Sequence, residues 1–442
     1  MKLMDLPMHP SSLLARLCRQ EPLGASETGG GMVRQLPLAF LPRSDQPDAS
    51  PAARDRHAEG TALLVAVDNG NDALKGALLH AQLPQLTVRR ISTAYAPAEV
   101  MRVGEEIPTW QVDASEPFWI GNEALQVATT VESLPIGMSP ERLLDRRWQH
   151  FFFACLAELL QAAGYGRPGQ NWQGEYRLSV SLGLPNEELS RNSVHPTVLQ
   201  ALRPLLETPR LVQRTDEQGQ TNTWRLRLVD VMPYPQTFGS FVAWYYSPTG
   251  EALPTEVVRH VTVDIGGGQL HRCTVTIDPH PDGRPRLRMQ ATLLDEGTIA
   301  LARAVREHLR SHYPGIRLSD TEAQQVLVSG TLLRGGRRVD VTSLVSDVIQ
   351  ARAQRLLTHL RHLLQEEQTF VMCTGGGTIL LERSLRTLLG QRRAQESMLI
   401  VPRELAAVLN AAGGYLLAQA AAQQRIQQRL SAATASRDEE DH

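Results

Sequence analysis

Short apolar runs that end at glycine turns recur along this chain of 442 residues. Two of them, "LLVAVDNGN" at 63–71 and "HVTVDIGGG" at 260–268, share the order of an apolar run, an aspartate and one or more glycines. A second apolar run follows each turn, at 75–80 and at 269–277. Apolar runs bounded by turn residues are typical of buried strands. The pattern therefore predicts two similar β-hairpins.

Segments with apolar residues at helical spacing accompany both hairpins. The first, over 139–164, has Ser139 as its expected N-cap, Glu141 close behind it and Gly164 as its expected stop. The other predicted elements are helices at 297–313, 346–366 and 402–424, and strands at 176–185, 226–235 and 369–374. The order strand, glycine turn, strand and then helices thus occurs twice. It predicts a duplicated α/β architecture with two lobes and a cleft.

The order of these elements also predicts domain boundaries. One lobe is expected over 61–250 together with 401–424, and the other over 251–400. Residues 1–60 are rich in proline, serine, glycine and charge without sustained periodicity, and we expect a flexible, disordered arm there. Residues 425–442 are expected to form a polar tail.

Composition narrows the class of protein. The formal charge is -2 with both signs interspersed, so neither nucleic acid nor a membrane is an expected direct partner. No apolar run approaches the roughly 20 residues that span a bilayer, and the first residues lack the apolar centre of a secretory signal. The four cysteines have no zinc-site or disulfide spacing. We expect a cytoplasmic protein in which Cys273 and Cys373 are buried thiols.

Lysine occurs at only two positions, Lys2 and Lys75, whereas every other basic residue apart from histidine is arginine. Lys75 lies in the second strand of the first hairpin, close to its glycine turn. Arginine ends in a wide planar fork and lysine in a slim point charge. We therefore expect Lys75 to occupy a tight place that it shares with a phosphate.

The aspartates and the glycine turns have the chemistry of a Mg-nucleotide site. Mg²⁺ keeps most of its water shell and is held by carboxylates, so Asp68 and Asp264 are the expected metal-binding residues, acting through water. Glycines let backbone N–H groups approach phosphate oxygens closely. The expected nucleotide-binding turns are Asn69, Gly70 and Asn71, then Gly266, Gly267 and Gly268, and, under the base and ribose, Thr374, Gly375, Gly376 and Gly377.

Together these motifs resemble those of the actin-like ATPases. "VDNGNDALKGA" is similar to the first phosphate motif of that family, "VDIGGGQLH" to the second and "TGGG" to the adenosine motif. "SLGLPNEEL" and "LNAAGGY" resemble its bacterial and archaeal plasmid-segregation branch, the ParM and StbA type. The resemblance spans about Thr61 to Gln424. It implies an actin-like (ribonuclease H-like duplicated) two-lobed ATPase fold that binds Mg-ATP, or the GTP equivalent, in the cleft.

The resemblance also implies roles for single residues. Gln236 would orient the attacking water, Asp264 would help to position that water and the metal, and His271 matches the histidine after actin's second phosphate loop. The implied function is ATP hydrolysis coupled to assembly into filaments, which segregate or position plasmid DNA through a separate DNA-binding adaptor protein. The residues expected at the adenosine are Arg303, Arg306 and Glu307, with Glu307 on the ribose hydroxyls.

Each feature also has a structural alternative. Asp-Asn-Gly is a common hairpin turn, His271 could be a packed strand residue, and Gln236 could cap the helix that follows it. The chain contains neither a P-loop motif nor a dinucleotide-binding glycine motif. The alternative functions are a non-polymerising nucleotide-dependent switch or scaffold, and a small-molecule kinase of the same superfamily.

Overall fold

The computed structural model describes residues 8–19, 32–37, 62–83, 85–98, 107–127, 131–134, 140–185, 196–279, 285–390 and 398–423. The chain divides into two compact units. The smaller unit contains Met1–Pro10, Gly70–Asp72 and Pro254–Leu409, and the larger unit contains Ser11–Asn69, Ala73–Leu253 and Asn410–His442. The chain thus returns from the smaller unit to the larger one at Asn410.

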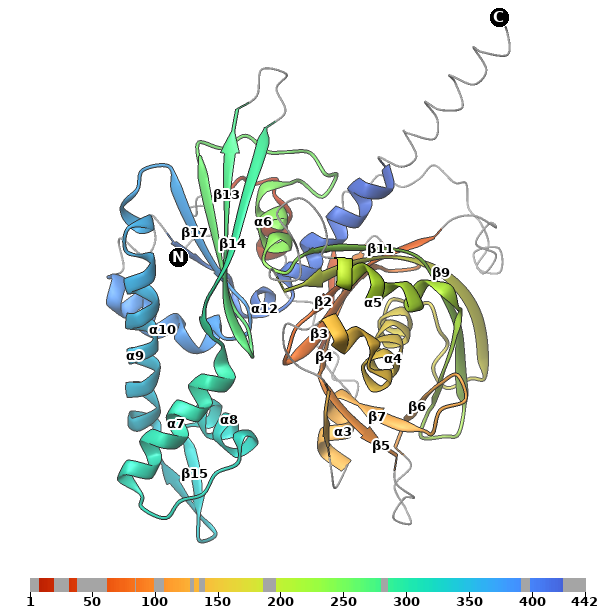
Figure 1. The fold of residues 1–442 in the computed structure, drawn as a ribbon, viewed down its shortest axis with the longest axis horizontal. Coiled ribbons are helices and arrows are strands. Elements are labelled where there is room, and N and C mark those ends of the chain that lie inside the picture. The colour runs from red at the N-terminus through yellow and green to blue at the C-terminus, as the bar shows by residue number, and fades with distance from the viewer. Residues whose placement is uncertain are drawn as a thin grey trace, which may run out of the picture. The chain divides into compact units, whose positions relative to one another are not determined.

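The larger unit is built on an 11-stranded sheet in the order β1-β4-β3-β2-β9-β11-β10-β6-β7-β5-β8 (Figure 1). β2, β9 and β11 are parallel neighbours, and β3 and β4 continue antiparallel from β2. The strands are β1 (Met32–Pro37), β2 (Leu63–Asn69), β3 (Ala73–Leu79), β4 (Gln85–Ser92), β5 (Ala94–Pro97), β6 (Thr109–Val112), β7 (Phe118–Ile120), β8 (Glu132–Ser133), β9 (Trp172–Leu184), β10 (Arg210–Thr215) and β11 (Thr221–Pro235).

The smaller unit is built on a five-stranded sheet in the order β14-β13-β12-β17-β18, with a separate hairpin β15-β16. β12 pairs antiparallel with β13 and parallel with β17, which pairs parallel with β18. The strands are β12 (Arg259–Ile265), β13 (Gln269–Asp278), β14 (Arg286–Glu296), β15 (Thr331–Arg334), β16 (Arg337–Asp340), β17 (Thr369–Thr374) and β18 (Met398–Ile400).

The two sheets repeat one topology. In the larger unit β4-β3-β2 are antiparallel neighbours and β2-β9-β11 are parallel ones. In the smaller unit β14-β13-β12 are antiparallel neighbours and β12-β17-β18 are parallel ones. Each unit has a hydrophobic core of its own. The predicted duplicated α/β architecture is therefore confirmed, and both predicted hairpins are present as β2-β3 and β12-β13.

Helix α4 (Arg146–Ala162) fills the core of the larger unit. Twelve of its residues are buried, including the aromatic run Phe151–Phe153. The side chain of Asp145 caps it by accepting from the N–H groups of the first turn, and Gly164, with φ at +85°, follows its end as predicted. The expected N-cap, Ser139, lies outside the described residues. A 3₁₀ turn occupies Pro140–Leu144 instead of the first helical turn.

Parts of the expected N-terminal arm are ordered. Helix α1 (Leu13–Arg19) buries Leu13 and Leu14 completely or nearly so, and it contacts helix α6 (Phe238–Tyr245). Its Leu13 N–H donates to the Tyr246 carbonyl at 2.9 Å. β1 pairs with β4 over six residues. The prediction of a disordered arm is wrong for these two segments, because apolar residues too few to show a period still complete an existing helix face and sheet edge.

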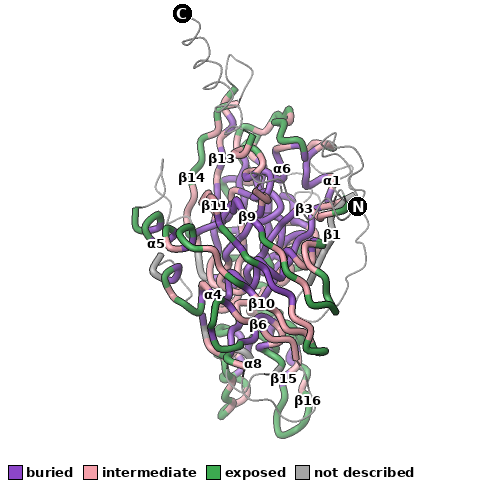
Figure 2. The backbone as a smooth tube through the Cα atoms, turned by 90° about the vertical axis from the view of Figure 1, so that its right-hand side faces the viewer, coloured by how far each residue is buried: buried purple, intermediate pink, exposed green. Residues whose placement is uncertain are grey.

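The helices of the smaller unit lie partly outside the predicted ranges. The helix predicted at 346–366 is α9 (Thr342–Leu360), and the last predicted helix is divided into α12 (Arg403–Ala406) and a helix over 409–423. The polar stretch before α9 holds α8 (Asp320–Ser329) and the β15-β16 hairpin, which is largely exposed (Figure 2). The smaller unit also contains α7 (Thr298–His312) and α10 (Thr378–Leu389), and the larger unit contains α3 (Gly121–Val127) and α5 (Pro196–Glu207).

The cysteines behave as expected. Cys155, Cys273 and Cys373 are buried free thiols. Burial raises the pKa of the Cys373 thiol to about 12, which leaves it protonated and unreactive. Among the described helices, none is both long and apolar enough to cross a membrane.

A cluster of charged side chains is buried where α4 packs against β4. Arg89 is 1% exposed and forms an ion pair with Glu158 of α4. Arg214 Nη1 lies 3.9 Å from Glu158 Oε2, and its guanidinium lies 5.5 Å from the centre of the Trp110 ring. Burial, followed by the negative charge of Glu158, raises the pKa of Glu123 to about 7. The larger unit therefore contains a carboxyl group that is half protonated near neutral pH.

Glu123 makes the stability of the protein depend on pH. In the folded protein the pKa of Glu123 is about 7, whereas in the unfolded chain it has the ordinary value of 4.5. The folded state therefore binds this proton more tightly, and its contribution to the free energy of unfolding falls as the pH rises from 4.5 to 7. We expect Glu123→Gln to raise the free energy of unfolding at pH 8 by up to about 3 kcal/mol and to have little effect at pH 4.5. Urea unfolding at both pH values measures this.

The control for this experiment is Glu175→Gln, which changes a carboxylate that is 64% exposed. A difference between wild type and Glu123→Gln that is the same at both pH values would contradict the interpretation.

Candidate functional site

Both strand-end aspartates lie at the carboxyl ends of parallel strands. Asp68 lies near the end of β2, beside β9, and Asp264 lies near the end of β12, beside β17. Ligands of α/β proteins bind at this edge of the sheet. Because the two sheets share one topology, Asp68 and Asp264 occupy equivalent positions in the two units.

Lys75 lies directly opposite Asp68 on the neighbouring strand β3. Its Nζ lies 3.7 Å from Asp68 Oδ2, and the two residues are 8% and 4% exposed. A buried carboxylate and a buried ammonium each need a partner, because each has lost its water. Lys75 is thus confined beside a negative charge, and its contact with a phosphate stays a prediction.

Gln236 follows β11 and is 8% exposed. Its Nε2 donates to the backbone carbonyl of Asn69 at 2.6 Å. The residue at the N-cap of α6 is Thr237, and the first-turn N–H of Ser240 donates to Asn410 Oδ1 at 3.2 Å. The alternative that Gln236 caps α6 is therefore wrong. The amide of Gln236 instead holds the start of the first glycine turn.

His271 has the same place in the smaller unit as Lys75 has in the larger one. It lies directly opposite Asp264 on β13, as Lys75 lies opposite Asp68 on β3. It is 4% exposed, and its Nε2 lies 2.8 Å from Gln269 Oε1. Opposed residues project from the same face of a sheet. His271 is therefore a buried strand residue and also a neighbour of Asp264, and a catalytic role for it stays a prediction.

The turn Gly266–Gly268 is held by the start of α7. The N–H groups of Gly297, Thr298 and Ile299 donate to the three carbonyl oxygens of this turn at 2.9 to 3.0 Å. Among the described residues, the N–H groups of Gly267 and Gly268 have no hydrogen-bond partner. Two backbone donors in a glycine turn are what a phosphate group requires.

The first glycine turn packs against this second one within the smaller unit. A Cβ on Gly267 would lie 2.5 Å from the Cβ of Asp72. A Cβ on Gly268 would collide with the side-chain amide of Asn71. Glycine is thus required at both positions because the tip of the β2-β3 turn lies against them.

The third glycine turn lies beside Asp264. Thr374 is opposite Asp264 on β17, and its Oγ1 donates to the Ala406 carbonyl at 2.9 Å. Gly375 has φ at +86°, and a Cβ there would collide with the Asp264 carboxylate. The N–H of Gly377 donates to the Ile265 carbonyl at 2.8 Å. This turn therefore sets the space available to the Asp264 carboxylate, a role that the sequence pattern did not predict.

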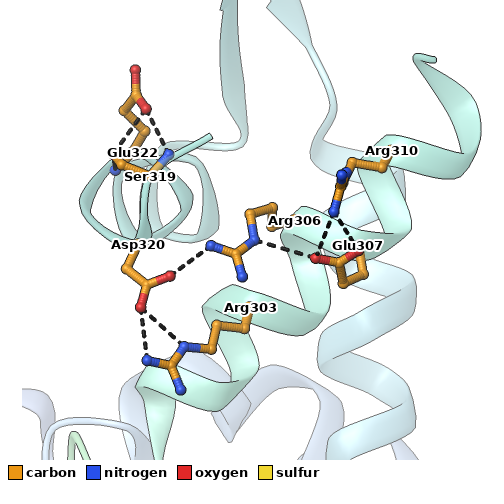
Figure 3. Close-up of polar contacts among 7 residues, drawn as sticks. All are labelled: Arg303, Arg306, Glu307, Arg310, Ser319, Asp320 and Glu322. Carbon is orange, nitrogen blue, oxygen red and sulfur yellow. Dashed lines mark hydrogen bonds and ion pairs between the residues drawn. The ribbon is translucent and has the colours of Figure 1, made fainter. Parts of the chain in front are cut away.

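The residues predicted at the adenosine form a surface network on α7 (Figure 3). Arg303 Nη2 and Arg306 Nη1 lie 2.8 and 2.6 Å from the two carboxylate oxygens of Asp320 on α8. Glu307 accepts from Arg310 at 3.1 Å. The hydrogen bond from Arg303 lowers the pKa of Asp320. Contact with a nucleotide, which stays a prediction, would require the two arginines to share or exchange this partner.

The donor set fits Mg²⁺ held through water. The described residues contain no group of three or more histidine, cysteine or acidic side chains that could hold a metal directly. Asp68 and Asp264 each offer carboxylate oxygens at a strand end, and hard oxygen ligands with retained waters are the usual environment of Mg²⁺. Each of these residues, taken in its own unit, could therefore hold an ion only together with waters and a phosphate.

Sequence analysis missed three residues that shape the two aspartate sites. Gly183 lies between Asp68 and Tyr234 on the sheet, and Gly297 supports the second turn. The sequence signal for Tyr234 is its position two residues before Gln236 at the end of an apolar strand. Gly183 and Gly297 could not be recognised from the sequence, because the residues that leave little or no room for a side chain at these positions are neighbours only in space.

Comparison with known proteins bears on the fold. Residues 262–387 match the model of the family described as archaeal actin homologue MreB-like, C-terminal. A search of curated protein sequences finds no match. Three similar solved structures are Ta0583, an archaeal actin homolog; the pCBH ParM non-polymerisable quadruple mutant; and Bacillus thuringiensis ParM with AMPPNP.

The solved structures share the fold with this chain at low sequence identity. Ta0583 has a TM-score of 0.58 and 16% identity, over 81% of this chain and 99% of its own. The pCBH ParM has a TM-score of 0.58 and 13% identity, over 81% and 99%. The Bacillus thuringiensis ParM has a TM-score of 0.54 and 16% identity, over 82% and 99%. The fold is therefore that of the actin-like proteins.

The third glycine turn offers a matched pair of substitutions. A Cβ at Gly375 would collide with Asp264 at a left-handed φ, whereas a Cβ at Gly376 would have no atom within 4 Å. We expect Gly375→Ala to lower the free energy of unfolding by at least about 1 to 2 kcal/mol from backbone strain. Gly376→Ala should stay within about 0.5 kcal/mol of wild type. Denaturant unfolding measures both, and equal effects would contradict the geometry.

Proposed function

We propose, starting from a chain that has the actin-like fold, that this protein binds and hydrolyses Mg-ATP and assembles with copies of itself into nucleotide-dependent filaments. The observation behind the proposal is the duplicated motif. An aspartate stands at the end of a central strand in each unit, opposite Lys75 in one and His271 in the other, and next to glycine turns. Such a repeated pair of carboxylates and turns suits a cation and a chain of phosphates.

Each unit would supply one set of nucleotide-contacting groups. Lys75 and the turn Asn69–Asn71 would bind phosphate oxygens, and so would the free N–H groups of Gly267 and Gly268. Asp68 and Asp264 would hold the waters of the bound Mg²⁺, which neutralises phosphate charge when present. Arg303, Arg306 and Glu307 on α7 and the turn Thr374–Gly377 would contact the adenosine.

Hydrolysis in this proposal depends on positioning. Phosphoryl transfer asks the protein mainly to align the attacking water and to stabilise charge. Gln236 has a side-chain carbonyl that could orient a water while its Nε2 is held by the Asn69 carbonyl. Asp264, with His271 opposite it, would help to hold that water.

Filament assembly and its use are inferred from the neighbours. One similar structure is described as a non-polymerisable mutant of a ParM, and others as a ParM with AMPPNP or with ADP. Head-to-tail contacts that do not close into a ring give a filament. We propose a cytoplasmic filament that segregates or positions plasmid DNA through a separate adaptor, because the near-neutral net charge of the chain does not favour direct contact with DNA.

Sedimentation of the full chain tests the proposal. The purified protein is centrifuged at several concentrations with Mg-ATP, with Mg-ADP and without nucleotide, while phosphate release is recorded. We expect a pellet above a critical concentration with Mg-ATP only, accompanied by hydrolysis. Nucleotide binding without polymer would favour the switch or scaffold, and turnover that requires a small-molecule acceptor would favour the kinase.

Removal of the Lys75 charge should weaken nucleotide binding. We expect Lys75→Ala, and Lys75→Met as a variant that keeps the volume of the side chain, to bind Mg-ATP at least about tenfold more weakly, a loss of about 1.4 kcal/mol. Titration with a fluorescent ATP analogue measures the affinity, and circular dichroism controls for folding. If both variants fold and bind Mg-ATP as tightly as the wild type, the prediction that Lys75 contacts a phosphate is wrong.

Loss of the Gln236 amide should act on the rate. We expect Gln236→Ala to lower kcat by roughly 10² to 10⁴, as for a group that orients or activates a reactant, and to change the affinity for Mg-ATP less than about threefold. Steady-state phosphate release and nucleotide titration separate the two effects. If the affinity falls and kcat does not, Gln236 only supports the turn at Asn69.

A further inference from the structure

A row of polar side chains crosses the sheet of the larger unit at Asp68. Register places Lys75, Asp68, Gly183 and Tyr234 on the adjacent strands β3, β2, β9 and β11. Residues opposite one another project from the same face of a sheet. Gly183 has no side chain, so Asp68 and Tyr234 face each other across an empty position. A Cβ placed on Gly183 would lie 3.1 Å from the Tyr234 hydroxyl oxygen and 3.2 Å from Asp68 Oδ1.

A second glycine completes a slot for the phenol. A Cβ on Gly414, in the helix over 409–423, would lie 2.7 Å from Tyr234 Cζ and would collide with its hydroxyl. Tyr234 is 3% exposed. An added Cβ would be tight at Gly183 and would collide at Gly414, so the phenol packs closely against both backbones.

The Tyr234 hydroxyl has acceptors on both sides of this slot. It donates to the Asn410 carbonyl at 3.2 Å, which is long for a hydrogen bond from a hydroxyl. Asn410 lies in the first turn of the helix, where the chain re-enters the larger unit. The Asp68 carboxylate on the other side is a stronger acceptor than a carbonyl. Burial, together with the charge of Asp68, raises the pKa of Tyr234, so the phenol stays a neutral donor.

We propose that Tyr234 is a positioning residue that links the Asp68 carboxylate to the first turn of the helix over 409–423. The waters of a cation held at Asp68 would donate to the carboxylate oxygens and weaken their pull on the phenol. The hydroxyl then bonds more tightly to the Asn410 carbonyl, and this turn of the helix becomes more stable. The inference rests on the proposed Mg-nucleotide binding, and it adds a route by which the bound state reaches the segment that connects the two units.

Hydrogen exchange of the full chain tests this link. Exchange of the amides in 410–417 is followed with and without saturating Mg-AMPPNP in the wild type, in Tyr234→Phe and in Tyr415→Phe. Tyr415 is a matched control, because it is a buried tyrosine of the same helix. We expect the nucleotide to slow exchange about tenfold in the wild type and in Tyr415→Phe, and less than twofold in Tyr234→Phe.

A separate titration measures nucleotide affinity in each variant. The link is refuted if Tyr234→Phe binds Mg-AMPPNP and its amide exchange in 410–417 slows as much as in the wild type. It is also refuted if the wild type binds Mg-AMPPNP and its exchange does not slow. In both cases the proposed function stands. If the wild type binds no nucleotide, both the link and the proposed function fail.

The variant Asp68→Asn gives an independent check, because it removes the negative charge that competes with the Asn410 carbonyl for the Tyr234 hydroxyl. We expect slow exchange in 410–417 without nucleotide in this variant, and fast exchange would refute the link.

Discussion

A strand-end carboxylate with no side chain beside it is the constraint on which the candidate site depends in both units. Gly183 leaves the space next to Asp68, and Gly375 leaves the space next to Asp264. A side chain at Gly375 would displace the carboxylate, and one at Gly183 would press against both Asp68 and Tyr234. In the proposed function this room would be used by a hydrated cation, which is bulky and keeps its waters. The glycines therefore set the size of each site, while the strands set its position.

The charges at these sites are stabilised by one another. Asp68 Oδ2 and Lys75 Nζ are 3.7 Å apart and both residues are buried, so each charge stabilises the other. The equivalent pair in the smaller unit is Asp264 and His271. The two hairpins thus share one backbone arrangement and carry a different side chain opposite each aspartate. One unit has an ammonium group at this position, and the other has an imidazole ring that forms hydrogen bonds.

Much of this could be predicted from sequence, for reasons that are local. The two hairpins, the aspartates at their strand ends and the core helix were predictable because strand, turn and helix patterns arise from neighbouring residues. The predictions failed where distant segments decide the outcome. Leu13 and Leu14 look like part of an unstructured arm until α6 provides a surface for them. For Gln236 the sequence also left open a helix-capping role, and only the Asn69 carbonyl, far away in sequence, decides against that alternative.

The sequence by itself determined the duplicated α/β architecture, the identity of the charged residues and the turns that hold them, because apolar periodicity and glycine conformations act over a few residues. Only the tertiary structure decided which of these groups meet. It placed His271 opposite Asp264, Gly375 against the Asp264 carboxylate and Tyr234 between Asp68 and Asn410. Strand register and helix docking fix such meetings, and both depend on packing between segments that are far apart in the chain.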